Sequence, residues 1–241
     1  MKNQKKIYHL RFFFLILFLL STSLISLKTL KKVNIEDIRI SGSTFFSKND
    51  LLNNSSLILP IRLIFINTYF LEKELKKNLS LKNISVNRQL SPFGLKVFIH
   101  TRTPLAYGER ILDNKKILGF IDKDGIFINK PYADLKNFTK IKIKVFGWKE
   151  KFKKIISEIL IAHDNYEFEI VKITFSPNGF LTVEEKDLKK ILLGFNPNLI
   201  NSQLKIINNL KIEFKEKNFF QKIDNIDLTD PKKPKIKVFK P

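Results

Sequence analysis

The chain has 241 residues, of which 44% are hydrophobic and 28% charged, and it contains no cysteine. This composition is typical of a globular protein, and it excludes disulfide bonds, thiolate metal sites and cysteine nucleophiles. The formal net charge of +21 raises the question of nucleic-acid binding. The positive charge is almost all lysine, however, and it is spread along the chain, whereas base and phosphate recognition favours clustered arginine. We therefore expect no nucleic-acid partner.

The amino-terminal segment predicts a transmembrane helix over residues 12–30. Phe12 to Leu27 carries no charge and consists mainly of Phe, Leu and Ile. As a helix this run is about 24 Å long, against about 30 Å for the bilayer core, and the flanking Arg11 and Lys28 can extend it by snorkelling. We expect residues 1–11 to be a cytoplasmic tail, although basic residues flank both ends almost equally. A cleaved signal peptide and a buried helix of a soluble domain are the alternatives.

Residues 33–102 predict a first domain with the element order β-α-α-β-β. A strand containing Ile38 and Ile40 ends at Ser41-Gly42. Ser47 and Asp50 then form an S-x-x-D capping box, which predicts that a helix begins at Lys48. A second helix is expected at about 68–79, with leucines on one face, and two strands follow around the turn at 91–94.

The stretch from Ile38 to Leu52 also resembles a phosphate-binding loop, because a glycine turn joins a strand to a helix. Such loops need G-x-x-x-x-G-K-[ST] or G-x-G-x-x-G, and here Gly42 stands alone. Two bulky residues, Phe45 and Phe46, follow it, and we expect both rings to pack beneath the helix. The segment therefore predicts a turn, and we expect no cofactor.

Residues 103–230 predict a second, mostly antiparallel β domain with two helices. Hairpins are expected at 118–128 and 167–186, and a strand at 138–146. Helical spacing of apolar residues indicates one helix after residue 152 and another after the Asn196-Pro197 cap. Strand-like pieces around 223–230 and 235–239 close the chain, and residues 231–241 form a carboxyl-terminal edge segment. The fold class is therefore α+β.

The candidate catalytic and metal-binding residues are better explained by structural roles. His9, His100 and His163 have no metal-ligand spacing, and Asp122 to Gly125 lacks the further acids of a calcium loop. The acidic cluster of Glu184, Glu185 and Asp187 is expected to be a solvated edge. No nucleophile with a partnered base is present, so we expect neither an enzyme nor a small-molecule substrate.

Four segments together resemble the bacterial cell-division family FtsQ, also called DivIB. "VNIEDIRISGSTFFSKNDLL" resembles the opening of the family's POTRA domain, and "LKVFIHTRTPLAYGE" resembles its E-R-x-P-x-A element, with Thr101 where an acid is common. "GFIDKDGIFI" resembles the start of the family's β domain. "IDNIDLTD" resembles its closing strand, with Thr229 in place of a basic residue.

The resemblance implies a non-enzymatic scaffold of the divisome, which links early and late division proteins at the septum. It implies a single-pass protein of the plasma (inner) membrane whose carboxyl-terminal domains are exported. The implied partners are an FtsB–FtsL pair, bound by β-augmentation at the carboxyl end, and FtsK at the POTRA domain. The corresponding partner-binding residues are Asp230, Lys235, Ile236, Lys237, Val238 and Phe239.

Pro231 and Pro234 depart from the family pattern at this edge segment. Because proline lacks a backbone donor, they raise the question of whether the edge can pair with a partner strand. Another class of function also fits a POTRA domain, namely a component of protein translocation or outer-membrane assembly. The absence of a long series of amphipathic barrel strands argues against that class.

Overall fold

The computed structural model describes residues 12–23, 30–132, 141–217, 220 and 223–239. The chain divides into two compact units, with the boundary between Thr101 and Arg102. Residues 12–23 are helical. Among the described residues, no helix combines the length and the apolar character needed to cross a bilayer. The expected span over 12–30 is thus not confirmed, and its residues 24–29, like the expected tail 1–11, lie outside the described residues.

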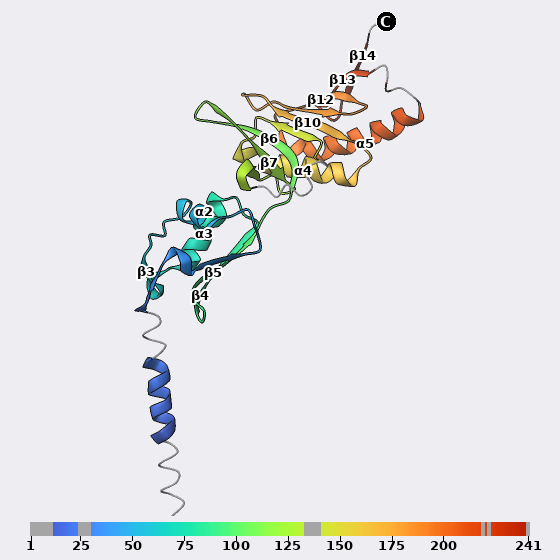
Figure 1. The fold of residues 1–241 in the computed structure, drawn as a ribbon. Coiled ribbons are helices and arrows are strands. Elements are labelled where there is room, and N and C mark those ends of the chain that lie inside the picture. The colour runs from blue at the N-terminus through green and yellow to red at the C-terminus, as the bar shows by residue number, and fades with distance from the viewer. Residues whose placement is uncertain (1–11, 24–29, 133–140, 218–219, 221–222, 240–241) are drawn as a thin grey trace, which may run out of the picture. The chain divides into compact units, whose positions relative to one another are not determined.

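The first unit contains a three-stranded sheet with two helices on one face (Figure 1). Its strand order is β2-β5-β4, with β2 parallel and β4 antiparallel to the central β5. The bounds are β2 (Ile38–Ser41), α2 (Lys48–Asn53), α3 (Thr68–Asn78), β4 (Asn83–Leu90) and β5 (Phe93–His100). The predicted order β-α-α-β-β is confirmed.

Local sequence explains how β2 leads into α2. Ser47 Oγ accepts the Asp50 N–H at 3.1 Å while Asp50 Oδ2 accepts the Ser47 N–H at 2.9 Å, so the predicted capping box is present. Gly42 has φ +88°, and a Cβ there would lie 2.4 Å from the Ile99 carbonyl oxygen, so the turn requires glycine. Phe46 is buried as expected, but the expectation was wrong for Phe45, which is 37% exposed. Consecutive side chains point in different directions, and only one of the two rings enters the core.

Between these elements lies a small second sheet that the sequence analysis missed. Strand β1 (Lys32–Val33) pairs antiparallel with β3 (Ile61–Arg62), and the Leu63 N–H donates to the Lys31 carbonyl at 3.3 Å. The short 3₁₀ helices η1 (Ile35–Asp37) and η2 (Leu63–Phe65) follow the two strands. Strands of two residues are too short to show a period in the sequence.

The second unit is built on one nine-stranded sheet of order β14-β13-β12-β11-β10-β9-β6-β7-β8. Its pairs are mostly antiparallel, as predicted, and the parallel ones are β6–β9, β9–β10 and β12–β13. The strands are β6 (Pro104–Leu112), β7 (Lys115–Asp122), β8 (Phe127–Asn129), β9 (Ile143–Phe146), β10 (Ile170–Phe175), β11 (Leu181–Glu185), β12 (Lys189–Gly194), β13 (Ile223–Asp227) and β14 (Lys235–Val238).

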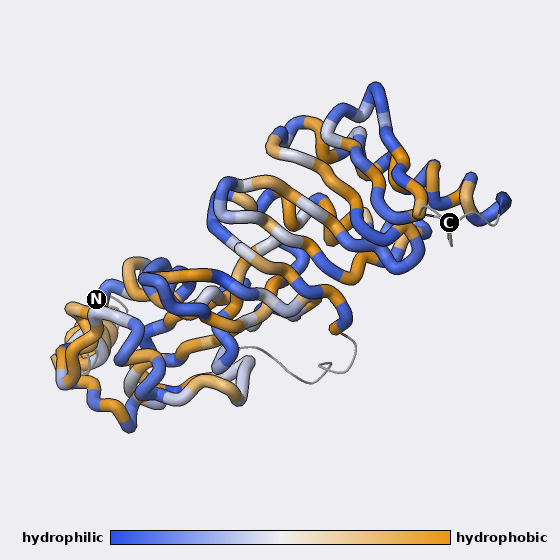
Figure 2. Tube along the Cα trace, turned by 90° about the horizontal axis from the view of Figure 1, so that it is seen from above, coloured by the Kyte–Doolittle hydropathy of each residue, from blue (hydrophilic) through white to orange (hydrophobic). Residues whose placement is uncertain are grey.

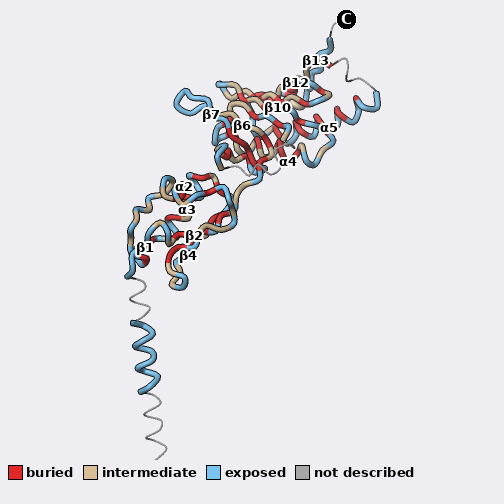
Figure 3. The backbone as a smooth tube through the Cα atoms, in the orientation of Figure 1, coloured by how far each residue is buried: buried red, intermediate tan, exposed pale blue. Residues whose placement is uncertain are grey.

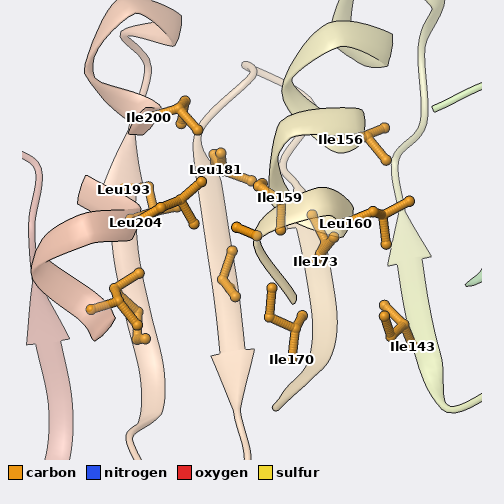
Figure 4. Close-up of a cluster of buried hydrophobic side chains, with 14 of the residues drawn as sticks. Ile143, Ile156, Ile159, Leu160, Ile170, Ile173, Leu181, Leu193, Ile200 and Leu204 are labelled. Carbon is orange, nitrogen blue, oxygen red and sulfur yellow. The ribbon is translucent and has the colours of Figure 1, made fainter. Parts of the chain in front are cut away.

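Two helices, α4 (Lys153–Asn165) and α5 (Ile200–Glu216), cover one face of this sheet (Figure 1). The 3₁₀ helices are η3 (Lys130–Tyr132), η5 (Glu150–Phe152) and η6 (Pro197–Leu199). Hydrophilic and hydrophobic residues alternate along much of the chain (Figure 2), and Figure 3 marks buried residues on the strands and on α4 and α5. Most of their side chains form one hydrophobic cluster. In Figure 4, Ile156, Ile159 and Leu160 of α4 lie over strand residues such as Ile173. The predicted helical spacing is thus the core-facing stripe of α4.

The turn from Asp122 to Gly125 is a hairpin turn, as the sequence predicts. One carboxylate oxygen of Asp122 accepts the N–H groups of Asp124 at 3.0 Å and Ile126 at 2.9 Å. The Arg102 guanidinium donates to the other oxygen at 2.5 Å and to Asp124 at 3.1 Å. These carboxylates therefore hold the backbone of the turn and the side chain of Arg102, which is the first residue of the second unit.

The acidic cluster after β11 is not the solvated edge that was expected, because Glu185 is buried. Its Oε1 accepts Lys211 Nζ at 2.8 Å and the Glu169 N–H at 2.9 Å. Its Oε2 accepts the N–H groups of Asp187 and Leu188, both at 2.7 Å. Asp187 also pairs with Lys211, so one lysine of α5 connects the helix to the turn between β11 and β12.

Burial of Lys211 lowers the pKa of its ammonium, but the hydrogen bonds from that ammonium to Asp187 and Glu185 outweigh burial and raise the pKa above 10.5. Because this pKa is higher in the folded than in the unfolded chain, the protonated Lys211 stabilises the fold, and this contribution is fully present below about pH 10.5. That contribution is lost as the pH rises through the folded value.

We predict that Lys211→Met lowers the free energy of unfolding by about 3 kcal/mol, because it leaves the buried Glu185 carboxylate without its counter-ion. The matched control is Lys215→Met on the same helix, where the exposed lysine lies 3.8 Å from Glu167. That change should cost less than about 1 kcal/mol. Urea unfolding at pH 7 measures both values, and equal effects of the two variants would contradict the assignment.

Candidate partner-binding edge

Strand β14 forms one edge of the nine-stranded sheet. In the described part of the chain it has a strand, β13, on one side only. All four of its residues are exposed, and Figure 3 draws this end of the chain as exposed. An edge strand directs part of its backbone donors and acceptors away from the sheet, so a further strand can be added there.

The two prolines do not interrupt this strand. Pro231 and Pro234 lie in the connection between β13 and β14, and every residue from Lys235 to Val238 retains its N–H group. Asp230 stabilises the connection, because its Oδ1 accepts the Lys232 N–H at 2.9 Å and its carbonyl accepts the Lys233 N–H at 3.1 Å. Proline is suited to such turns, so the edge can still pair with an added strand.

One face of β14 is apolar and continues the helix-covered face of the sheet. Ile236 lies opposite Ile226, and Val238 lies opposite Ile223. Directly opposed residues project to the same face, and both β13 residues are fully buried. Ile236 and Val238 are nevertheless 40% and 45% exposed. The core-facing side of the sheet therefore extends into solvent at this edge, and the exposed Phe239 follows directly.

The other face of β14 is basic. Lys235 lies opposite Asp227, and Lys237 Nζ lies 3.7 Å from an Asp224 carboxylate oxygen. Lysines on an edge strand hinder pairing with a second copy of the same strand. The geometry thus brings together five of the six predicted partner-binding residues, while Asp230 belongs to the turn.

Gln203 fixes the carboxyl ends of the strands next to this edge. It is buried on α5, and its Nε2 donates to the Leu193 and Leu228 carbonyls at 2.7 Å each. The Leu228 N–H in turn donates to the Leu192 carbonyl at 2.9 Å. The sequence analysis missed this residue. A glutamine beside Leu204, on the buried side of an amphipathic helix, was the available signal.

Thr229, which replaces a basic residue of the family pattern, has a defined local role. Its hydroxyl and its backbone N–H donate to Asp227 Oδ1 at 2.7 Å and 2.9 Å. The hydrogen bond from the hydroxyl has the largest effect, and together the two bonds lower the pKa of Asp227 below 3.8. The positive charge of Lys235 lowers this pKa further. The stabilisation is therefore present above about pH 3.8 and is lost as the pH falls through the folded pKa.

Two of the three histidines have structural contacts. His163 Nδ1 accepts the Ile170 N–H at 3.1 Å beside an open cavity of about 360 Å³, and His100 packs edge-on against Phe98. His9 lies outside the described residues. The described ranges hold no group of three or more His, Asp or Glu residues placed to bind a metal ion.

Two helices on one face of a β2-β5-β4 sheet, in the chain order β-α-α-β-β, define the first unit as a POTRA domain. Residues 33–101 match the family model described as the FtsQ-type POTRA domain. This confirms the resemblance to the FtsQ/DivIB family over that domain, and an FtsQ-type POTRA domain indicates a cell-division protein. No curated protein gives a significant match to the chain.

We predict that Thr229→Ala raises the pKa of Asp227 towards 3.8, because the variant loses the hydroxyl donor but keeps the backbone donor. An NMR titration of the Asp227 carboxyl carbon measures the shift. Thr182→Ala on β11 is the matched control and should leave the titration of Asp227 unchanged. An unchanged pKa in Thr229→Ala would show that the hydroxyl has no part in it.

Proposed function

We propose that the protein is a non-enzymatic scaffold of the divisome. The FtsQ-type POTRA domain at residues 33–101 is the observation that carries this proposal. The second unit supports it, because β14 is an edge strand of a mostly antiparallel sheet, with no neighbour on its outer side among the described residues, and so provides a surface for β-augmentation. The function consists of holding partners side by side at the septum, and it requires no reacting group.

The partner at β14 is a strand from a small coiled-coil membrane protein of the FtsB–FtsL kind. Backbone hydrogen bonds to the outer side of β14 would provide affinity that depends little on side chains. Specificity would come from the two faces, because Ile236 and Val238 offer exposed apolar surface while Lys235 and Lys237 lie on the opposite face. Covering the exposed apolar side chains removes them from water and favours the complex.

The POTRA domain provides a second docking surface in this proposal, with FtsK as the family-based candidate. Residues 12–30 anchor the chain in the plasma membrane, with residues 1–11 in the cytoplasm and the two units outside it. The uncharged run from Phe12 to Leu27 supports the anchor. A scaffold held at the membrane surface meets membrane-bound partners at high effective concentration.

We predict that the double variant Ile236→Asp, Val238→Asp abolishes co-purification of the coiled-coil partner, because two buried carboxylates would face the apolar side of the complex. The measurement is affinity co-purification of the full chain from detergent-solubilised membranes. The matched control is Ile111→Asp, Leu112→Asp at the β6–β7 hairpin, where both side chains are more than half exposed.

Circular dichroism and thermal unfolding should match the parent chain for both double variants. If the β14 variant is folded and still retains the partner, the edge-strand proposal is wrong. If the hairpin variant also loses the partner, the contact surface lies elsewhere on the second unit.

We predict that the full chain, fused to a fluorescent protein at its amino terminus, forms a band at midcell in dividing cells. The fusion lies on the expected cytoplasmic side and leaves β14 free. The measurement is fluorescence microscopy scored against membrane constriction, and a variant that lacks residues 33–101 should show whether the POTRA domain is needed.

A uniform envelope signal would contradict the septal role. Depletion of the protein then separates the alternatives: filamentous cells support a division function, whereas normal division with impaired outer-membrane protein assembly supports the translocation class.

A further inference from the structure

The POTRA domain exposes a run of large apolar side chains between α2 and the first half of α3. We call these residues the 58–70 patch: Ile58, Ile64, Phe65, Tyr69 and Phe70, which are 81%, 49%, 66%, 75% and 53% exposed. Single exposed apolar residues are common, but five within thirteen positions of one domain are unusual and indicate an interaction surface. The patch borders an open cavity of about 180 Å³ that Leu57, Phe65 and Phe70 help to line.

The segment that carries the 58–70 patch has no acidic residue. From Leu57 to Leu71 the only charged residue is Arg62. Arg62 lies opposite Lys32 in the β1–β3 pair, so both exposed side chains project to one face, and the exposed Lys73 follows on α3. Of the two carboxylates that follow on α3, Glu72 accepts the Val86 N–H, and Glu74 accepts both donors of Ser56 at the edge of the cavity.

Backbone pairing places the patch next to the chain that leaves the apolar segment 12–30. The Leu63 N–H donates to the Lys31 carbonyl at 3.3 Å, and Val33 pairs with Ile61. The patch is therefore joined by backbone hydrogen bonds to the residue that follows the apolar segment 12–30. Even if the bilayer core ends at Leu27, four residues span at most about 14 Å before Lys31. The headgroup layer itself is roughly 5 to 8 Å thick.

We propose that the 58–70 patch is a membrane-contact surface that inserts into the headgroup layer beside the chain's own anchor. Aromatic and aliphatic side chains would enter the acyl boundary, while Arg62, Lys32 and Lys73 would meet anionic headgroups. This combination of side chains also occurs at protein interfaces, but the short connection to the apolar segment favours lipid over a diffusing protein. The inference rests on the proposed membrane anchoring of residues 12–30.

The functional consequence concerns orientation. A single anchor leaves the first folded domain free to tilt and rotate about the connection. A second contact through the patch would fix which face of the POTRA domain is directed away from the bilayer. The solvent face of its sheet, which bears Phe98, would then remain available to protein partners.

The test uses the full chain, which has no cysteine, so that single-cysteine variants report one position each. Phe65→Cys carries a fluorescent label in the patch, and Tyr69→Cys is a second reporter should the first variant fold poorly. Phe98→Cys on β5 is the matched control, because it is also an exposed aromatic position of this unit. Ile16→Cys reports the anchor.

The labelled chains are reconstituted in vesicles of phosphatidylcholine and phosphatidylglycerol. Quenching by acyl-chain-brominated lipid is then compared with quenching by iodide in the water. We expect lipid quenching several-fold stronger at positions 65 and 69 than at position 98, with iodide in the opposite order.

Three results would overturn the proposal, and they are distinguishable. Lipid quenching at position 16, with positions 65 and 69 behaving like position 98, means that the anchor is correct and the patch is not a lipid contact. Lipid quenching at none of the four positions means that the anchoring itself is wrong. Shielding of position 65 from iodide in native membranes, but not in lipid vesicles, means that a protein covers the patch.

Discussion

The carboxylate of Glu185 is the interaction on which the arrangement of the second unit depends. It accepts two backbone N–H groups of the β11–β12 turn, the N–H of Glu169 before β10, and the ammonium of Lys211 on α5. A buried carboxylate is stable only when its lone pairs are satisfied, so this turn and this helix can be joined in only one relative position. Helix α5 in turn carries Gln203, which holds the ends of β12 and β13. The edge strand β14 thus pairs with a strand that is itself firmly fixed.

Much of the fold follows from local sequence because its signals are short-range. The Ser47–Asp50 capping box marks the beginning of α2, and the helical spacing around Ile156 marks α4. The burial of Glu185 could not be read in the same way, because its counter-ion is 26 positions away in the chain. Likewise, β1 and β3 pair across almost thirty residues with too few residues each to show a period. Contacts between segments distant in sequence decided these cases.

At the candidate partner-binding edge, too, some features could be predicted from local sequence and others could not. Its apolar and basic residues alternate in the sequence, so the two faces of β14 could be predicted from Lys235 and Ile236 alone. The position of the prolines relative to the strand could not be predicted, because it depends on where the strand begins. In the structure, Pro231 and Pro234 lie in the connection before β14. Thr229 was read as a departure from the family pattern. In the folded chain its hydroxyl donates to Asp227, which lies opposite Lys235, and lowers the pKa of that carboxyl.

The exposed apolar surfaces at β14 and in the 58–70 patch differ in what can cover them. The surface at β14 extends a buried face of the sheet, and the outer backbone groups of this edge strand are available for pairing. It therefore favours a partner strand that supplies both hydrogen bonds and side chains. The 58–70 patch belongs mainly to a 3₁₀ turn and the first turn of a helix, neither of which presents the edge of a sheet. Such a surface needs no backbone hydrogen bonds from a partner, and any apolar medium can remove its side chains from water. Its backbone connection to Lys31 then favours the bilayer beside the anchor over a partner strand.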